Sequence, residues 1–135
     1  MIAAINGAAA GLGLVEALYC DVRFATPQAK LTTAFARRGL IAEYGLSWLL
    51  PRLIGHGAAL DLLLSGRIVR GEEAHRLGLV NFLSEPDSVV DDAVAYAQDL
   101  ATHCAPSSMA TIKAQVSADH DRDFASAVAA ADDLL

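Results

Sequence analysis

Residues 5–13 read Ile-Asn-Gly-Ala-Ala-Ala-Gly-Leu-Gly, and the apolar, helix-forming run Leu12 to Cys20 overlaps their end. This order predicts a strand, a turn of small residues and a helix. The first N–H groups of a helix have no partner within it and carry partial positive charge, so such a turn can stabilise a carbonyl oxygen that becomes negative. A second interpretation stays equally open, namely a tight strand-to-helix turn that needs glycine only for packing.

The glycine spacing argues against nucleotide binding. Glycines at positions 7, 11 and 13 give the pattern G-x-x-x-G-x-G, whereas a dinucleotide fingerprint requires G-x-G-x-x-G. A Walker loop would also need lysine followed by serine or threonine at the helix start, and Leu12-Gly13-Leu14 has neither. The stretch is therefore interpreted as an apolar turn whose backbone can lie against an anion.

Composition narrows the class of protein further. The length of 135 residues is that of one ordinary domain. The net charge of −6 gives no general basic surface for binding nucleic acid. Its hydrophobic fraction of 54% suggests apolar surface that is buried against another chain. No apolar run reaches roughly 18 residues, so we expect no membrane span. Four scattered histidines predict no metal site, and two distant cysteines indicate buried thiols in a reducing, cytoplasmic compartment.

Strand and helix patterns alternate in the first part of the chain, and only helices follow. We predict strands over 2–6, 22–25, 30–33 and 79–83. We predict helices over 12–20, 43–54, 57–65, 71–77 and 88–104, then one that opens after Ala105 and one over 124–135. This arrangement is typical of an α/β core, residues 1–86, followed by a helical region, residues 87–135.

Several segments, in order, resemble the crotonase superfamily, the enoyl-CoA hydratase/isomerase family. They are Ile2–Gly7, Gly11–Asp21, Gly39–Gly55, Leu63–Arg67 and Glu73–Val80. The resemblance covers most of the chain and weakens after about residue 115. It implies an α/β, crotonase-like (ClpP/crotonase) fold, truncated at the N-terminus and with a C-terminal helical extension that serves oligomerisation.

The resemblance also implies a substrate and partners. Family members bind acyl-CoA thioesters, and coenzyme A enters as part of the substrate rather than as a cofactor. They assemble as trimers or pairs of trimers, so we expect a homotrimer or hexamer. A complete member has a further N-terminal half that supplies a second oxyanion N–H and much of the CoA surface, and a separate N-terminal half is therefore a conceivable partner.

Site residues follow from the same resemblance. The Leu12 N–H would be the oxyanion donor, with Gly11 shaping the approach of the substrate. Substrate contacts would come from Ala8, Ala10, Val15, Ala34, Phe35 and Arg38. Arg38 has an arginine neighbour, and either one would meet an acyl carboxylate, a phosphate or Glu43, or else remain solvated.

The chain departs from the family at both catalytic carboxylates. Family hydratases use two glutamates to position water and shuttle its protons. Alignment places Val15 and Phe35 at these positions, and neither side chain transfers protons. Glu16 lies one residue away, which is about 100° of helix rotation, so it should face away from the site. The standard two-glutamate mechanism is therefore not encoded.

Glu43, eight residues after Phe35, is a candidate substitute at the start of the predicted helix. Some isomerases of the superfamily place an acidic base near this position. The alternative is a carboxylate of the first helical turn that faces water and is favoured by the helix dipole. The sequence therefore predicts acyl-CoA processing with isomerase-like proton transfer. The other hypothesis is an inactive truncated subunit that acts as a binding or oligomerisation module.

Overall fold

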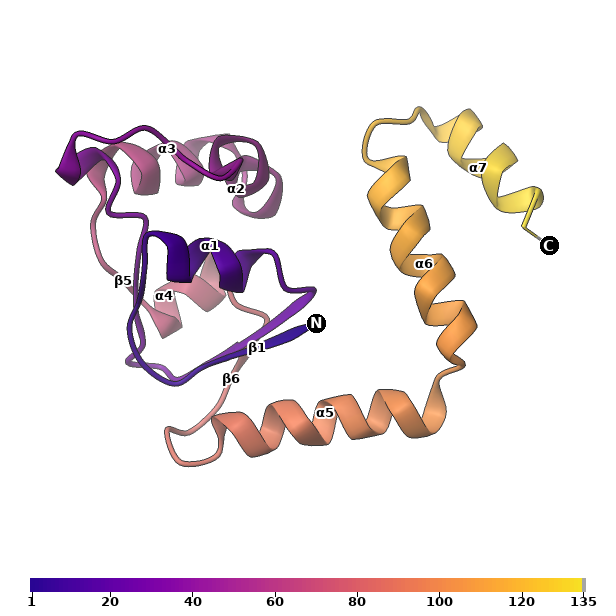
Figure 1. The fold of residues 1–135 in the computed structure, drawn as a ribbon, viewed down its shortest axis with the longest axis horizontal. Helices are drawn as coiled ribbons and strands as arrows, with labels where there is room; N and C mark the ends of the chain where they lie inside the picture. The colour runs from indigo at the N-terminus through magenta and orange to yellow at the C-terminus, as the bar shows by residue number, and fades with distance from the viewer. Residues whose placement is uncertain (135) are drawn as a thin grey trace. The chain divides into compact units, whose positions relative to one another are not determined.

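The computed structural model describes residues 1–134 and divides the chain into two compact units, Met1–Ala95 and Tyr96–Leu135 (Figure 1). The strands are β1 Ile2–Ile5, β2 Ala9–Ala10, β3 Val22–Ala25, β4 Lys30–Thr32, β5 Val69–Arg70 and β6 Phe82–Leu83. The helices are α1 Leu12–Leu18, the 3-10 helix η1 Ala36–Arg38, α2 Leu46–Ile54, α3 His56–Ser65, α4 Gly71–Arg76, α5 Val89–His103, α6 Pro106–Asp119 and α7 Phe124–Asp132. Strands and helices thus alternate first, and helices alone follow, as the sequence predicts.

The first sheet has the order β1-β3-β6, and all three strands are parallel. Ile2 lies opposite Val22 and Ile5 opposite Ala25, with α1 as the connection between these two strands. Parallel neighbours need such a crossover, because a short hairpin can join only antiparallel strands. The apolar run after the small-residue turn therefore becomes the helix of a βαβ unit.

The second sheet has the order β2-β4-β5 and positions the small-residue turn. Ala9 and Ala10 pair in parallel with Leu31 and Thr32, and β5 is antiparallel to β4. The sequence does not predict β2, since alanine has little preference for strands. It forms because the neighbouring strand supplies hydrogen-bonding partners, so the turn between β1 and α1 is anchored along its length.

The hydrophobic core surrounds α1. Large side chains from helices, strands and a loop are 2% exposed or less, namely Leu14, Leu31, Leu46, Leu50 and Leu79. Figure 1 shows α1 between the α2–α3 pair and the strands of the first sheet. Burial of each such leucine contributes about 1.5–3 kcal/mol to folding. The core therefore fixes the position of α1 and, with it, of the helix start.

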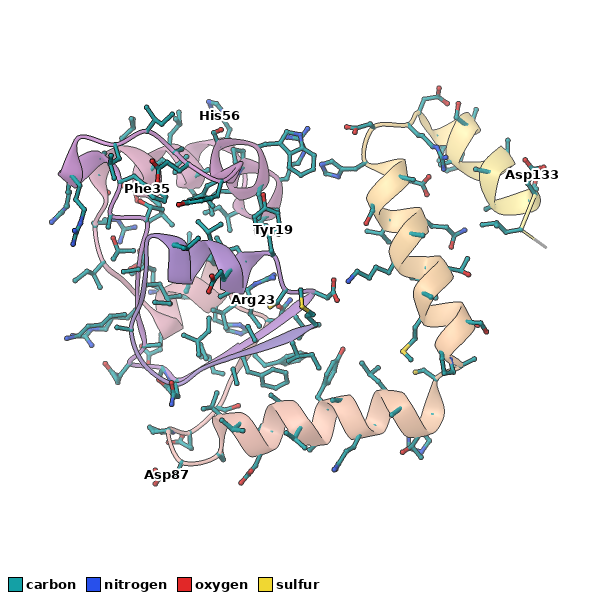
Figure 2. All side chains as sticks on the ribbon, in the orientation of Figure 1. Tyr19, Arg23, Phe35, His56, Asp87 and Asp133 are labelled. Atoms are coloured by element: carbon teal, nitrogen blue, oxygen red, sulfur yellow. The ribbon has the colours of Figure 1, made fainter. Side chains whose placement is uncertain are left out.

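Arg23 is a buried cation in the central strand β3, below α1 in Figure 2. Its Nε donates to the carbonyl of Leu79 at 2.7 Å, and its Nη1 donates to the carbonyl of Cys20 at 2.6 Å. Burial lowers the pKa of the guanidinium from its usual value. The arginine thus ties the end of α1 to the loop before β6.

Cys20 and Cys104 are free thiols and only half-buried, which corrects the expectation of buried cysteines.

The predicted helix over 43–54 begins only at Leu46. Tyr44 and Gly45 have φ angles of 55° and 73°, in the left-handed region, which an α-helix cannot include. Glu43 therefore lies in the turn before α2 rather than in its first turn, and its carbonyl accepts a hydrogen bond from the Leu46 N–H at 3.0 Å. Pro51 lies inside α2, which continues to Ile54.

The predicted strand over 79–83 is reduced to Phe82–Leu83. Gly78 has a φ of 82°, its N–H donates to the carbonyl of His75, and the Leu79 N–H donates to the carbonyl of Ala74. These two bonds form a Schellman motif that closes α4. The N–H of Leu79 is used to close the helix and is therefore not available for strand pairing.

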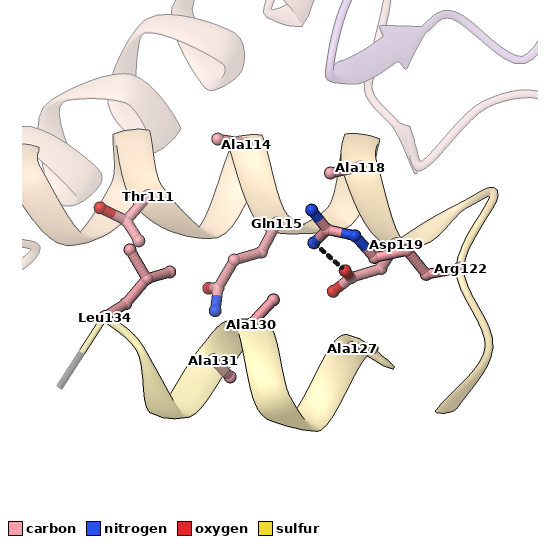
Figure 3. A pocket seen from close by; sticks show the side chains of 10 residues that line it. All are labelled: Thr111, Ala114, Gln115, Ala118, Asp119, Arg122, Ala127, Ala130, Ala131 and Leu134. Carbon is pink, nitrogen blue, oxygen red and sulfur yellow. Dashed lines mark hydrogen bonds and ion pairs between the residues drawn. The ribbon is translucent and has the colours of Figure 1, made fainter. Parts of the chain in front are cut away.

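The second unit contains the antiparallel helices α6 and α7, with a cavity of about 320 Å³ between them (Figure 3). Small side chains such as Ala118 and Ala130 line it, and Arg122 pairs with Asp119 at 2.9 Å. Elsewhere on these helices apolar side chains are open to solvent, with Phe124 86% exposed. Within residues 1–134, no helix combines the length and apolar character that crossing a membrane requires.

Candidate active site

A cavity of about 310 Å³ lies where the small-residue turn enters α1. Its lining consists of Ala10, Gly11, Thr33, Ala34, Phe35, Arg38 and Leu40. Five of these are residues that the sequence assigns to the oxyanion hole or to substrate contacts. Residues 10–11, which precede β3 in the sequence, and residues 33–40, which follow it, thus line the same cavity.

Gly11 shapes the entry to α1. Its backbone angles, φ 52° and ψ −121°, fall outside the regions that residues with a Cβ adopt readily. Its N–H donates to the carbonyl of Thr32 at 3.0 Å, and its carbonyl accepts from the Val15 N–H at 3.1 Å. The Gly11 N–H is therefore occupied. Leu12, the first residue of α1, has an N–H that has no partner within the helix, and its side chain is 47% exposed.

The opposite wall of the cavity follows β4. Ala34 has a φ of 59°, which costs a residue with a Cβ of the order of 1 kcal/mol. The Thr32 hydroxyl accepts a hydrogen bond from the Ala34 N–H at 3.1 Å and donates to the carbonyl of Gly66 at 2.9 Å. The Thr33 hydroxyl donates to the carbonyl of Leu62 at 2.8 Å. Two threonines thus hold the strained wall against the end of α3.

The two adjacent arginines have different surroundings. The Arg37 Nε donates to the carbonyl of Ser65 at 2.7 Å, so this side chain joins η1 to the end of α3. Arg38 lines the cavity, and its backbone N–H donates to the carbonyl of Phe35 at 2.9 Å. Figure 2 shows Phe35 beside α3. Of the pair, only Arg38 therefore reaches the candidate site.

Four predicted site residues do not line this cavity: Ala8, Leu12, Val15 and Glu43. Val15 is 2% exposed and packs in the core, while Glu16 is exposed, as the rotation along α1 predicts. Glu43 is half-buried in the turn before α2. Ala8 is exposed just before β2.

Sequence reasoning missed Thr33 and Leu40 as lining residues. Gly39, with a φ of 70°, turns the chain after η1, and the Leu40 N–H then donates to the carbonyl of Phe35 at 3.0 Å. The glycine was the available signal for this turn. Thr33 gave none, because its role depends on the carbonyl of Leu62, which is distant in the sequence.

A charged cluster centred on Arg67 lies outside the cavity. Arg67 pairs with Asp61 and with Glu73, each at 2.7 Å. The hydrogen bond from Arg67 is the main cause that lowers the pKa of Glu73, and both carboxylates raise the pKa of Arg67. The cluster joins α3 to α4 across the loop at Gly66. No group of three metal-ligating side chains occurs in residues 1–134.

The fold is similar to that of solved structures of known proteins. A crystal structure of an enoyl-CoA hydratase from Mycobacterium marinum matches with a TM-score of 0.81 and 57% identity, over 90% of this chain and 61% of that one. The fold is therefore that of the crotonase superfamily, as the sequence predicts. All of residues 1–135 match the family model for enoyl-CoA hydratase/isomerase, and the chain belongs to this family.

Two curated relatives illustrate the range of the family. A probable enoyl-CoA hydratase of Mycobacterium leprae (strain TN) is 46% identical over 103 residues, which are 76% of this chain and 35% of that protein. The 1,2-epoxyphenylacetyl-CoA isomerase of Escherichia coli (strain K12) is 39% identical over 102 residues, 76% of this chain and 39% of that protein. The chain thus spans little more than a third of these relatives.

Proposed function

We propose that this chain acts on acyl-CoA thioesters by isomerase-like proton transfer rather than by hydration. The observation that carries the proposal is the lining of the cavity at Gly11. Its lining includes Arg38, Thr33 and apolar residues but no carboxylate, and the resemblance places Val15 and Phe35 at the positions of the two glutamates. Hydration needs groups that position water and move its protons.

The thioester carbonyl would lie against the start of α1. There the Leu12 N–H donates to the oxygen as it gains negative charge, and the absence of a side chain at Gly11 allows the close approach. The family resemblance implies that a second donor comes from a segment other than residues 1–135. One such donor contributes about 10²–10³ in rate.

Glu43 would be the base in this mechanism. Its carboxylate takes a proton from a carbon next to the thioester or its double bond, the double bond shifts, and the same carboxylic acid returns the proton to another carbon. Substrate and product are isomers, so no water enters the balance. Glu43 does not line the cavity at Gly11, so this role rests on the family resemblance and on the half-buried place of the residue in the turn before α2.

The test compares two reactions of one substrate, crotonyl-CoA, in the whole protein as its gene encodes it. NMR in deuterated water follows exchange of the carbon-bound protons, and absorbance follows hydration of the double bond. We expect measurable exchange with hydration below detection. Ordinary hydratase turnover would refute the proposal, and its loss in Glu16→Gln would then identify Glu16 as the missing acid.

The second candidate is a module for binding or oligomerisation without catalysis. It is supported by the apolar side chains that α6 and α7 leave in solvent, among them Val116 at 69% and Ile112 at 57% exposed. Such surface commonly marks an interface. Calorimetric titration with an acyl-CoA separates the two candidates, because the enzyme must bind the thioester and a purely structural module need not.

A further inference from the structure

Arg38 is the one charged residue among those that line the cavity at Gly11. Within residues 1–134 its guanidinium forms no ion pair, although Arg67 holds two carboxylates and Arg37 bonds to a carbonyl. The other lining side chains are apolar, except for Thr33, whose hydroxyl donates to the carbonyl of Leu62. Arg38 is therefore a solvent-exposed cation beside the cavity, without an ion-pair partner among these residues.

Arg38 is exposed, and a guanidinium beside an apolar cavity favours a planar anion. Its fixed fork of donors matches the two oxygens of a carboxylate, and such charge-assisted pairs are about twice as strong as neutral hydrogen bonds. The size of the site limits where this anion can be on the substrate. A volume of about 310 Å³ is at the small end of the range of about 300–1,000 Å³ for ligand sites.

An acyl-CoA can carry an anion at the end of its acyl chain or at the phosphates of coenzyme A, and the position of the cavity distinguishes the two. Gly11, at which the thioester carbonyl is proposed to lie, shares the cavity with Arg38. The group that meets Arg38 must therefore be close to the thioester along the molecule. The end of a short acyl chain satisfies this condition, whereas the phosphates of coenzyme A are separated from the thioester by the whole pantetheine arm.

We propose that Arg38 is a specificity-determining residue that binds a carboxylate at the far end of a short acyl chain. The preferred substrates are then CoA thioesters of short dicarboxylic acids. This inference rests on the proposed function, because it takes the thioester to be bound at Gly11.

Two saturated thioesters of equal chain length test the inference without any reaction. Glutaryl-CoA ends in a carboxylate, and pentanoyl-CoA ends in a methyl group. Calorimetric titration of the whole protein, as its gene encodes it, should give a dissociation constant about tenfold lower for glutaryl-CoA. Arg38→Met should remove this preference while it changes the affinity for pentanoyl-CoA less than about twofold. Arg38→Lys should retain part of the preference, since it keeps the charge but not the fork.

The matched control is Arg70→Met, which removes the same charge outside the cavity. Arg70 is exposed and donates to the Gln28 side chain at 3.0 Å, so its loss should leave both affinities unchanged. Equal weakening of both thioesters by Arg38→Met would assign the anion to a CoA phosphate and overturn the inference. Unchanged affinities would overturn it as well. Failure of the folded parent to bind either thioester would instead refute the proposed function, and the inference with it.

Discussion

Substitution of Gly11 by alanine tests whether the entry to α1 depends on glycine geometry. A Cβ at this position would have the Thr33 carbonyl oxygen as a neighbour at 3.9 Å, which is ordinary contact. Steric overlap therefore contributes nothing, and backbone strain at φ 52° and ψ −121° is the whole penalty. Strain of this kind costs about 1–3 kcal/mol. We expect Gly11→Ala to lower the free energy of unfolding by that amount.

Gly13 provides the matched control two residues later. It lies inside α1, its φ is not positive, and a Cβ there would meet no atom within 4 Å. Alanine is favoured over glycine in a helix by up to about 1 kcal/mol, so Gly13→Ala should stabilise the protein. The same chemical change should thus have opposite signs at two nearby positions.

Urea denaturation followed by tryptophan fluorescence measures both variants. Trp48 is the single tryptophan of the chain and lies in α2, so its signal reports on the unit that contains the site. Gly11→Ala should also slow proton exchange, because it disturbs the direction of the Leu12 N–H. A Gly11→Ala variant as stable as the parent would refute the argument that this turn requires glycine.

Three further predictions concern packing, pH and assembly. Gly71→Ala should lower the free energy of unfolding by about 3 kcal/mol or more, because its Cβ would clash with the Thr26 carbonyl oxygen. Gly57→Ala is the control, since a Cβ there would meet open space and should not destabilise the protein. Thermal unfolding of the two variants measures the difference. The Arg67 hydrogen bond lowers the pKa of Glu73 in the folded state, so its stabilisation is present above the unfolded value of about 4.3 and is lost as pH falls below it. Unfolding measured from pH 6 to pH 3 should show a smaller loss of stability for Glu73→Gln, and parallel curves would exclude this contribution. The apolar surface of α6 and α7 predicts a trimer or larger assembly, or aggregation, and light scattering that finds a stable monomer at micromolar concentration would contradict it.

The alternation of strands and helices was predictable because it depends on local patterns of apolar residues and glycines. The βαβ unit around the small-residue turn follows from an apolar strand, glycines and an apolar helical run, and the structure has it. The errors arose where one residue overrides a pattern. Tyr44 takes a left-handed conformation and delays α2, and Gly78 closes α4 with bonds that the predicted strand would have used.

The candidate site was open to prediction only where it depends on a matching motif. Gly11, Phe35 and Arg38 line one cavity, and their roles in substrate binding stay predictions. Thr33 and Leu40 could not be found this way, because their positions depend on contacts with α3 and on the turn after η1. Hydrogen bonds between residues far apart in sequence leave no local pattern.

The role of Glu43 is the central claim, and proton exchange tests it most directly. Glu43→Gln keeps the size of the side chain but cannot accept a proton. Exchange of the substrate's carbon-bound protons with deuterated water, followed by NMR in the whole protein, should fall by about 10²–10⁴. The affinity for the acyl-CoA should change little, and Glu16→Gln, on the exposed face of α1, should exchange at the parent rate. Exchange in Glu43→Gln as fast as in the parent would contradict the account, because another group would then be the base.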